Sequence, residues 1–283
     1  MNFKKNIRRV IREIFRYMPI KEKINIPVMH GELLKGRTAL ITGGASGIGL
    51  EIAKSFALNE ANVIIVGRDV SKLEKAKKEI MSLNKNVFID FEQLDISKVN
   101  ELEKNLNSIL KKINMPIDIL VNNAGVLCMK DFWNMDEREF DRIINTDLKG
   151  TYFLTQIYSK YLIKNKIKGN ILNISSSSSV RPAITPYHLA KNSLNAFTKG
   201  LAKELIKYGI VVNGIAPGPT ATDMLLEGDE NINRPSSPNG RYATPEEIAN
   251  LSVILVSNLA KSIVGDTIFA TGGSGTLTYD DWD

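Results

Sequence analysis

The chain has 283 residues, of which 43% are hydrophobic and 24% charged, and its formal net charge is +6. A chain of this length can bury a large core without metal or disulfide support, and its single cysteine excludes an internal disulfide and suits a reducing compartment. The sequence contains neither an apolar run of the roughly 20 residues that span a bilayer nor a secretory signal pattern, so we expect a cytoplasmic globular protein.

Residues 1–18 form a basic segment with one apolar helical face. Six lysines and arginines stand there against one glutamate, which gives +5 and leaves about +1 for the remaining residues. This distribution argues against a folded domain that binds nucleic acid. Apolar residues recur at helical spacing, namely Phe3, Ile7, Val10, Ile11, Ile14, Phe15 and Met18.

Pro19 ends this predicted amphipathic helix, and the residues up to 35 are expected to form an extended arm. Three interpretations stay open for residues 1–35. The segment packs on its own domain or on a second subunit, residues 1–18 lie as a helix on an anionic membrane surface, or the segment is an organellar transit peptide.

From residue 37 onward, short β-branched runs alternate with helical patterns. One helical segment, "SKLEKAKKEIMSLN", is expected to begin with a capping box from Ser71 to Glu74. Alternation of this kind predicts a single doubly wound, Rossmann-type α/β domain over residues 36–275, followed by a tail at 276–283. Its seven parallel strands are expected at 37–42, 62–67, 86–91, 117–122, 169–175, 209–215 and 266–271.

A glycine-rich turn follows the first predicted strand, in "ITGGASGIGLEIAKSFA". Gly43, Gly47 and Gly49 stand between a strand and a helix, where a tight turn and close approach to a phosphate require missing side chains. The helix that begins near Gly47 would present its N–H groups to a pyrophosphate.

Four motifs in order make the chain similar to a known family. "TGGASGIG" at 42–49, "NNAG" at 122–125, "YHLAK" at 187–191 and "APGPTATDM" at 216–224 resemble those of the short-chain dehydrogenases/reductases. The resemblance extends from about Gly36 to Gly273. It implies a nicotinamide cofactor, hydride transfer between nicotinamide and a small-molecule carbonyl or secondary alcohol, and assembly into a homodimer or homotetramer.

The resemblance also implies the cofactor contacts. The pyrophosphate and adenosine ribose would meet Thr42, Gly43, Ser46, Gly47, Ile48 and Gly49, and the adenine would meet Asp95 and Ile96. Asn123, Ala124 and Gly125 would close over the cofactor, and the nicotinamide end would be held by Pro217, Gly218, Thr220 and Thr222. The alternative for each is turn chemistry, since these residue types populate strand ends in any case.

The end of the second strand favours NADP(H) over NAD(H). Gly67 stands where an acid that binds a free ribose 2′-hydroxyl is expected, and Arg68 follows with a guanidinium suited to phosphate. Asp69 either neutralises Arg68 or caps the next helix.

Tyr187 and Lys191 are one helical turn apart and therefore share a helix face. An ammonium beside a phenol stabilises the phenolate, which makes Tyr187 a candidate general acid/base; Lys191 would also hold the nicotinamide ribose. By the resemblance, the catalytic serine lies just past the fifth strand, at Ser176, with Ser175 and Ser177 as alternatives. The other serines of "SSSSS" are expected to be loop filler, and Arg181 a surface residue.

Asp147 departs from the family pattern, which usually has an asparagine that helps to hold a proton-relaying water. Either the replacement is tolerated, or the added charge near Lys191 shifts the pH optimum or impairs the relay; Asn145 should face elsewhere.

Residues 221–244 are expected to form a lid over a substrate that is hydroxylated, sugar-like, bound to an acyl carrier, or sterol-like. With two histidines and one cysteine we expect no metal site, and His188 should be packed or exposed rather than catalytic. The rival hypothesis is a non-catalytic NADP(H)-binding regulatory protein or membrane-associated scaffold.

Overall fold

The computed structural model describes residues 27–127, 130–222 and 232–277. Its sheet has seven strands, and every neighbouring pair is parallel, in the order β3-β2-β1-β4-β5-β6-β7. This confirms the predicted fold class. The strands are β1 (Thr38–Thr42), β2 (Asn62–Gly67), β3 (Ile89–Gln93), β4 (Ile119–Asn122), β5 (Gly169–Ile174), β6 (Ile210–Pro217) and β7 (Thr267–Ala270).

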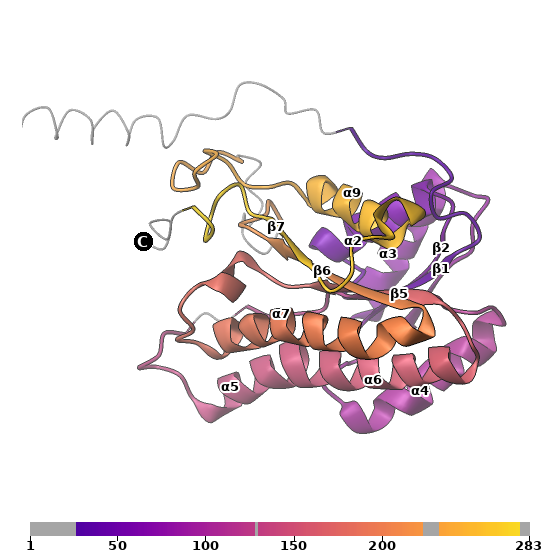
Figure 1. Cartoon of the computed structure of the whole chain (residues 1–283), viewed down its shortest axis with the longest axis horizontal. Coiled ribbons are helices and arrows are strands. Elements are labelled where there is room, and N and C mark those ends of the chain that lie inside the picture. The colour runs from indigo at the N-terminus through magenta and orange to yellow at the C-terminus, as the bar shows by residue number, and fades with distance from the viewer. Residues whose placement is uncertain (1–26, 128–129, 223–231, 278–283) are drawn as a thin grey trace, which may run out of the picture.

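Helices cover both faces of this sheet (Figure 1). One apolar core joins the sheet to α2, α3 and α9, and a second core joins it to α4, α6 and α7. The helices are α2 (Gly47–Leu58), α3 (Val70–Leu83), α4 (Val99–Ile113), α5 (Glu137–Ile143), α6 (Thr151–Lys164), α7 (Pro186–Leu205) and α9 (Pro245–Val256). Shorter helical turns are η1 (Ile144–Gly150), η2 (Ser177–Val180), η3 (Ile206–Tyr208) and η4 (Asn258–Ala260).

The strand order reverses at β1, which pairs with β2 on one side and with β4 on the other. The connections after β1 and β4 therefore leave in opposite directions and open a crevice at the carboxyl ends of the strands. In open parallel sheets this crevice is where ligands bind.

Helix starts follow the capping residues, with one correction to the sequence analysis. Asp69, not Ser71, caps α3: its side chain accepts a hydrogen bond from the Lys72 N–H, and Ser71 lies inside the helix. The predicted capping box from Ser71 to Glu74 is therefore wrong, because the helix begins earlier than its apolar pattern indicates. A true capping box starts α9, between Thr244 and Glu247.

The described part of the N-terminal arm packs on its own domain. Asn250 on α9 accepts from the Met29 N–H and donates to the Pro27 carbonyl, and Asn59 donates to the Met29 carbonyl. Residues 31–36 form turns, and Leu34 has 0% exposure in the core beside α2. The predicted amphipathic helix at 1–18 lies outside the described residues.

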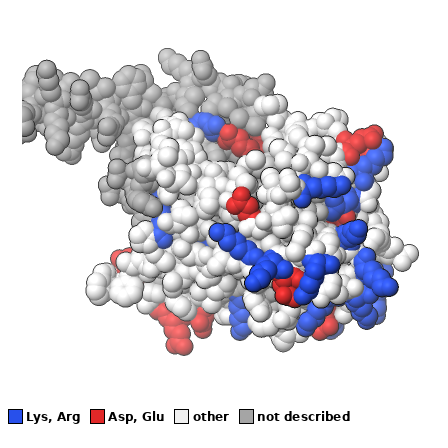
Figure 2. Space-filling model, in the orientation of Figure 1, with Lys and Arg blue, Asp and Glu red and all other residues white. Residues whose placement is uncertain are grey.

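None of the helices described is long and apolar enough to cross a bilayer. On the face in Figure 2, lysines and arginines gather toward the lower right, with acidic side chains among them. Charges of both signs therefore share this face.

Candidate active site

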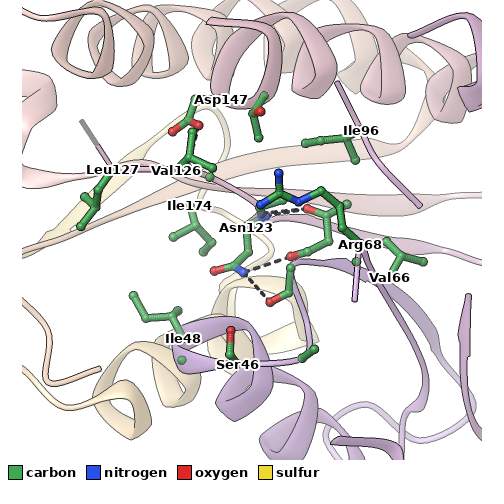
Figure 3. Close-up of a pocket in the computed structure, with 18 of the residues that line it drawn as sticks. Ser46, Ile48, Val66, Arg68, Ile96, Asn123, Val126, Leu127, Asp147 and Ile174 are labelled. Atoms are coloured by element: carbon green, nitrogen blue, oxygen red, sulfur yellow. Dashed lines mark hydrogen bonds between the residues drawn. The ribbon is translucent and has the colours of Figure 1, made fainter. Parts of the chain in front are cut away.

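A cavity of about 450 Å³ lies at the carboxyl ends of the strands, where the reversal of strand order predicts it. It brings together segments at the ends of β1, β2, β3, β4 and β5 with residues of η1 and α7. Figure 3 labels residues from these five strand ends and Asp147 of η1. Of the residues proposed from the sequence, its walls contain Thr42, Gly43, Ser46, Gly47, Ile48, Arg68, Asp95, Ile96, Asn123, Ala124, Gly125, Asp147, Tyr187, Lys191 and Thr222.

Five proposed residues are not among those that line the cavity: Gly49, Ser176, Pro217, Gly218 and Thr220. Gly49 instead packs beneath the turn, where a Cβ atom would come within 2.3 Å of Asn123 Nδ2 and of the Gly43 carbonyl. The Thr220 hydroxyl donates to the Gly218 carbonyl, and a Cβ atom on Gly218 would lie 2.6 Å from the Thr271 carbonyl. These three residues therefore shape the backbone next to the cavity.

The glycine turn is fastened to the end of β4 by one threonine and one asparagine. Thr42 Oγ1 accepts from the N–H groups of Asn123 and Ala124, both at 3.0 Å. Asn123 Nδ2 donates to the carbonyls of Thr42 and Gly43 at 3.0 and 3.2 Å (Figure 3). Gly43 and Gly47 have φ angles of +66° and +51°, which favour glycine.

The N-terminus of α2 opens onto the cavity through Ser46, Gly47 and Ile48. Ser46 precedes the helix in an extended conformation and makes no side-chain capping bond within the described structure. The first N–H groups of a helix have no intrahelical acceptor, so this end can bind an anion.

Two cations stand at the β2 end of the cavity. Arg68 and Lys72 both line it, together with Gly67 and Asp69, and the Arg68 side chain lies over the cavity in Figure 3. Lys72 was not expected at the cavity from the sequence. Its position in the first turn of the helix that follows Arg68 could have indicated it. One carboxylate oxygen of Asp95 accepts hydrogen bonds from the N–H and the hydroxyl of Ser97, as is common for aspartate in turns.

Tyr187 and Lys191 stand at the other end of the cavity, on the first turns of α7. Thr185 caps this helix and Pro186 begins it, a pairing typical of helix N-termini. The Lys191 ammonium lies 5.5 Å from the centre of the Tyr187 ring and 3.5 Å from the Ile174 carbonyl. The predicted juxtaposition of phenol and ammonium is thus present.

The serine run is structural over most of its length, so the expectation of loop filler is wrong. Ser177 and Ser179 are buried, and the Ser179 hydroxyl donates to the Ser176 carbonyl and accepts from Asn195. Ser176 caps η2 by accepting from the Ser178 N–H. Ser175 lines the cavity, and its hydroxyl donates to the Lys191 carbonyl at 3.2 Å.

Arg181 and His188 are also packed into the fold. Arg181 is only 8% exposed and donates to Ser274 Oγ at 2.6 Å, so the expectation of a surface residue is wrong. The local sequence could not indicate this burial, because the partner is 93 positions away. His188 Nδ1 lies 2.6 Å from Thr185 Oγ1, and burial, followed by the charge of Arg181, lowers the pKa of His188.

Asp147 lies in the π-helical turn η1, and its side chain has 0% exposure. One carboxylate oxygen accepts from the Val126 N–H at 2.8 Å, and the other lies 3.3 Å from Lys191 Nζ. Burial raises the pKa of Asp147 against the attraction of Lys191. Burial, the largest single influence, would lower the pKa of Lys191, but the charge of Asp147, the Tyr187 phenol and the hydrogen bond to Asp147 together outweigh it, so the pKa is raised.

The described part of residues 221–244 is held by a β-bridge, an ion pair and backbone hydrogen bonds. Asn233 bridges to Arg241, whose guanidinium forms an ion pair with Glu247 at 2.7 Å on α9. The Asn239 N–H donates to the Gly272 carbonyl. The middle of the predicted lid, residues 223–231, lies outside the described residues.

Comparison with known proteins agrees with this architecture. The model of the family described as short chain dehydrogenase matches residues 37–233. The chain belongs to this family. The matched range contains the glycine turn, the residues that line the cavity and the Tyr187–Lys191 pair, and the chain is accordingly an oxidoreductase by class.

The similarity extends over nearly the whole length of several relatives. A 3alpha-hydroxysteroid dehydrogenase from Mediterraneibacter gnavus is 31% identical over 86% of this chain and 98% of its own. A 3-oxoacyl-(acyl-carrier-protein) reductase from Chlamydia trachomatis is 35% identical over 85% of this chain and 98% of its own. A structure of an actinorhodin polyketide ketoreductase with NADPH superposes with a TM-score of 0.78 at 27% identity, covering 85% of this chain and 97% of that one. These names do not favour the non-catalytic alternative.

Proposed function

We propose that this short-chain dehydrogenase is an NADP(H)-dependent carbonyl reductase or alcohol dehydrogenase with Tyr187 as its general acid/base. The single observation that carries this proposal is the two-ended cavity. Arg68 and Lys72 stand at one end, and Tyr187 and Lys191 stand at the other. A phosphorylated adenosine suits the first end, and proton transfer suits the second.

The residues around the cavity fit a dinucleotide. A Cβ atom on Gly43 would come within 3.0 Å of Ala124 and Asn123, so glycine lets the turn pack against the end of β4. The N-terminus of α2 lines the cavity, where a pyrophosphate would meet its N–H groups. Gly125 lines the same wall beside Lys191 and Asp147. The bound cofactor would supply or accept a hydride.

In the proposed reduction, Tyr187 donates its hydroxyl proton to the substrate oxygen as a carbonyl becomes an alcohol. The Lys191 ammonium stabilises the phenolate that remains. Ser176, at the start of η2, would donate its O–H to the substrate oxygen while its own oxygen keeps accepting from the Ser178 N–H. Ser175 is the alternative, since its hydroxyl lies on the cavity wall.

The preference for NADP(H) rests on the end of β2. Gly67 leaves this position without a carboxylate that would bind a 2′-hydroxyl and repel a 2′-phosphate. The relative solved with NADPH supports the same choice. Thr222 at the cavity wall, with Pro217, Gly218 and Thr220 behind it, would border the nicotinamide end.

The first test is a fluorescence titration of the purified protein with NADPH and NADH in parallel. We expect saturable binding of both with clearly tighter binding of NADPH, followed by NADPH oxidation with members of a carbonyl panel. Absence of binding by either nucleotide would refute the proposed function. Equal affinity would refute only the phosphate site. Homo-oligomer formation, cytoplasmic location and membrane contact through residues 1–18 stay predictions.

A further inference from the structure

We propose that Asp147 cancels the charge of Lys191 at the Tyr187 phenol, and so sets the pH range in which this chain acts as a reductase. The inference rests on the proposed function and adds a positioning residue to it. It starts from an ion pair that is almost completely buried at the wall of the cavity.

The pair is held from several sides. Lys191 is 6% exposed at its side chain and Asp147 0%, with 3.3 Å between Nζ and Oδ2. The Val126 N–H fixes Asp147 Oδ1 at 2.8 Å. A Cβ atom on Gly125 would lie 2.9 Å from Asp147 Oδ2 and 3.3 Å from Lys191 Nζ, so glycine lets the carboxylate reach the ammonium.

The π-helical form of η1 places Asp147 there. Gly150 packs so tightly on the loop after β3 that a Cβ atom would lie 2.4 Å from the Ile96 carbonyl. Turns of this kind occur preferentially at functional sites. Asn145 does not line the cavity, so no neutral amide from η1 takes the place of the carboxylate there.

Few titratable groups face this pair in the described structure. From α7, which carries Lys191, the Tyr187 phenol faces it. From α5, Arg142 attracts Asp147 at longer range, but its guanidinium already pairs with Glu139. Among the described residues of β5 and of the loop after β4, backbone groups contact the pair, namely the Ile174 carbonyl and the Val126 N–H. A compact ion pair therefore faces Tyr187, where a lone cation would otherwise stand.

The chemical consequence has a definite sign. A lone ammonium would favour the phenolate, which is the base required to oxidise an alcohol. Partial cancellation by Asp147 weakens this preference, and the neutral phenol is the acid required for reduction. The ion pair is therefore expected to favour reduction over oxidation, compared with a chain that has a neutral side chain at position 147.

The test is an ultraviolet titration of tyrosinate in the full chain, with and without saturating NADP⁺. Each protein is compared with the same protein carrying Tyr187→Phe, so that the difference isolates this phenol. In Asp147→Asn we expect ionisation of Tyr187 to begin at lower pH than in the wild-type chain. Asp147→Ser provides a second uncharged variant, with folding of both checked by circular dichroism. Asp141→Asn on α5, an exposed carboxylate, is the matched control and should follow wild type.

Coincident titration curves for wild type and either folded Asp147 variant would overturn the inference, because a merely structural role changes stability and leaves this ionisation in place. The NADPH titration separates the two proposals. If nucleotide binds but the tyrosinate curves coincide, the charge-cancelling role fails and the proposed function stands. If no nucleotide binds, the proposed function fails, while the curves without NADP⁺ still report on the ion pair.

Discussion

The carboxylate of Asp69 accepts a hydrogen bond from the Lys72 N–H at 3.1 Å and so caps α3. An acid directly after Arg68 could have neutralised its guanidinium. Its use as a helix cap leaves the guanidinium available to the cavity that Arg68 and Lys72 both line. The phosphate preference of this end can therefore be tested one cation at a time.

We predict that Arg68→Ala weakens NADPH binding by roughly 10- to 100-fold and NADH binding much less, because a charge-assisted contact to phosphate is lost. Lys72→Ala should act in the same direction. Lys75→Ala, on an exposed position of α3 outside the cavity wall, is the control for general charge effects. Equal losses for the two nucleotides would show that neither cation meets the 2′-phosphate.

We predict that Tyr187→Phe lowers carbonyl reduction by at least about 100-fold and leaves NADPH affinity nearly unchanged, because only the proton donor is removed. The measurement pairs steady-state NADPH oxidation with the fluorescence titration. Tyr208→Phe, on η3 and half exposed, should behave as wild type. Retention of activity in Tyr187→Phe would refute the acid/base assignment.

The fold and most of the cavity could be predicted because their signals are local. β-Branched runs mark the strands of the parallel sheet, although β3 begins at Ile89 and not at the expected residue 86. The glycines of the first turn all lie within residues 43–49, and Tyr187 and Lys191 share one helix. Contacts between distant segments gave no such signal. Burial of Arg181 depends on Ser274, and burial of Ser177 depends on the packing of η2 against α7.

The ion pair of Asp147 was only half predictable. The sequence places an acid where the resemblance to the family implies an amide, but the distance to Lys191 is set by the π-helical turn and by the space that Gly125 leaves. Neither feature has a recognisable sequence pattern of its own.

Gly49→Ala should destabilise the protein and weaken NADPH binding together, because its Cβ atom would come within 2.3 Å of Asn123 Nδ2 and the Gly43 carbonyl. We expect a loss of about 1–3 kcal/mol in urea unfolding. Gly200→Ala on α7, where no atom of the described residues outside the helix's own backbone lies within 4 Å of the new Cβ atom, should instead stabilise by about 0.5–1 kcal/mol. Unchanged stability in Gly49→Ala would mean that the turn relaxes freely around a side chain.

Stability should depend on pH through His188. Burial, and then the charge of Arg181, lowers the pKa of His188 below its ordinary 6.5, so the folded state binds fewer protons than the unfolded state. Its contribution is therefore complete above the unfolded pKa and is lost as the pH falls through the lowered value. Urea unfolding of wild type at about pH 7.5 and about pH 5.5 should show a larger loss than in His188→Gln. His30→Gln, at an exposed position, should keep the wild-type difference.

The last prediction concerns where the folded domain begins. The sequence suggests a boundary at Gly36, yet Leu34 is 0% exposed and packs in the core beside α2. We predict that Leu34→Ala lowers the free energy of unfolding by about 2–5 kcal/mol, as for other leucines deleted from a closely packed core. Leu277→Ala, at 81% exposure, should change it by less than about 0.5 kcal/mol. A negligible effect of Leu34→Ala would place the arm outside the cooperative unit, whereas the expected loss would make residues before Gly36 part of the fold that supports the cavity.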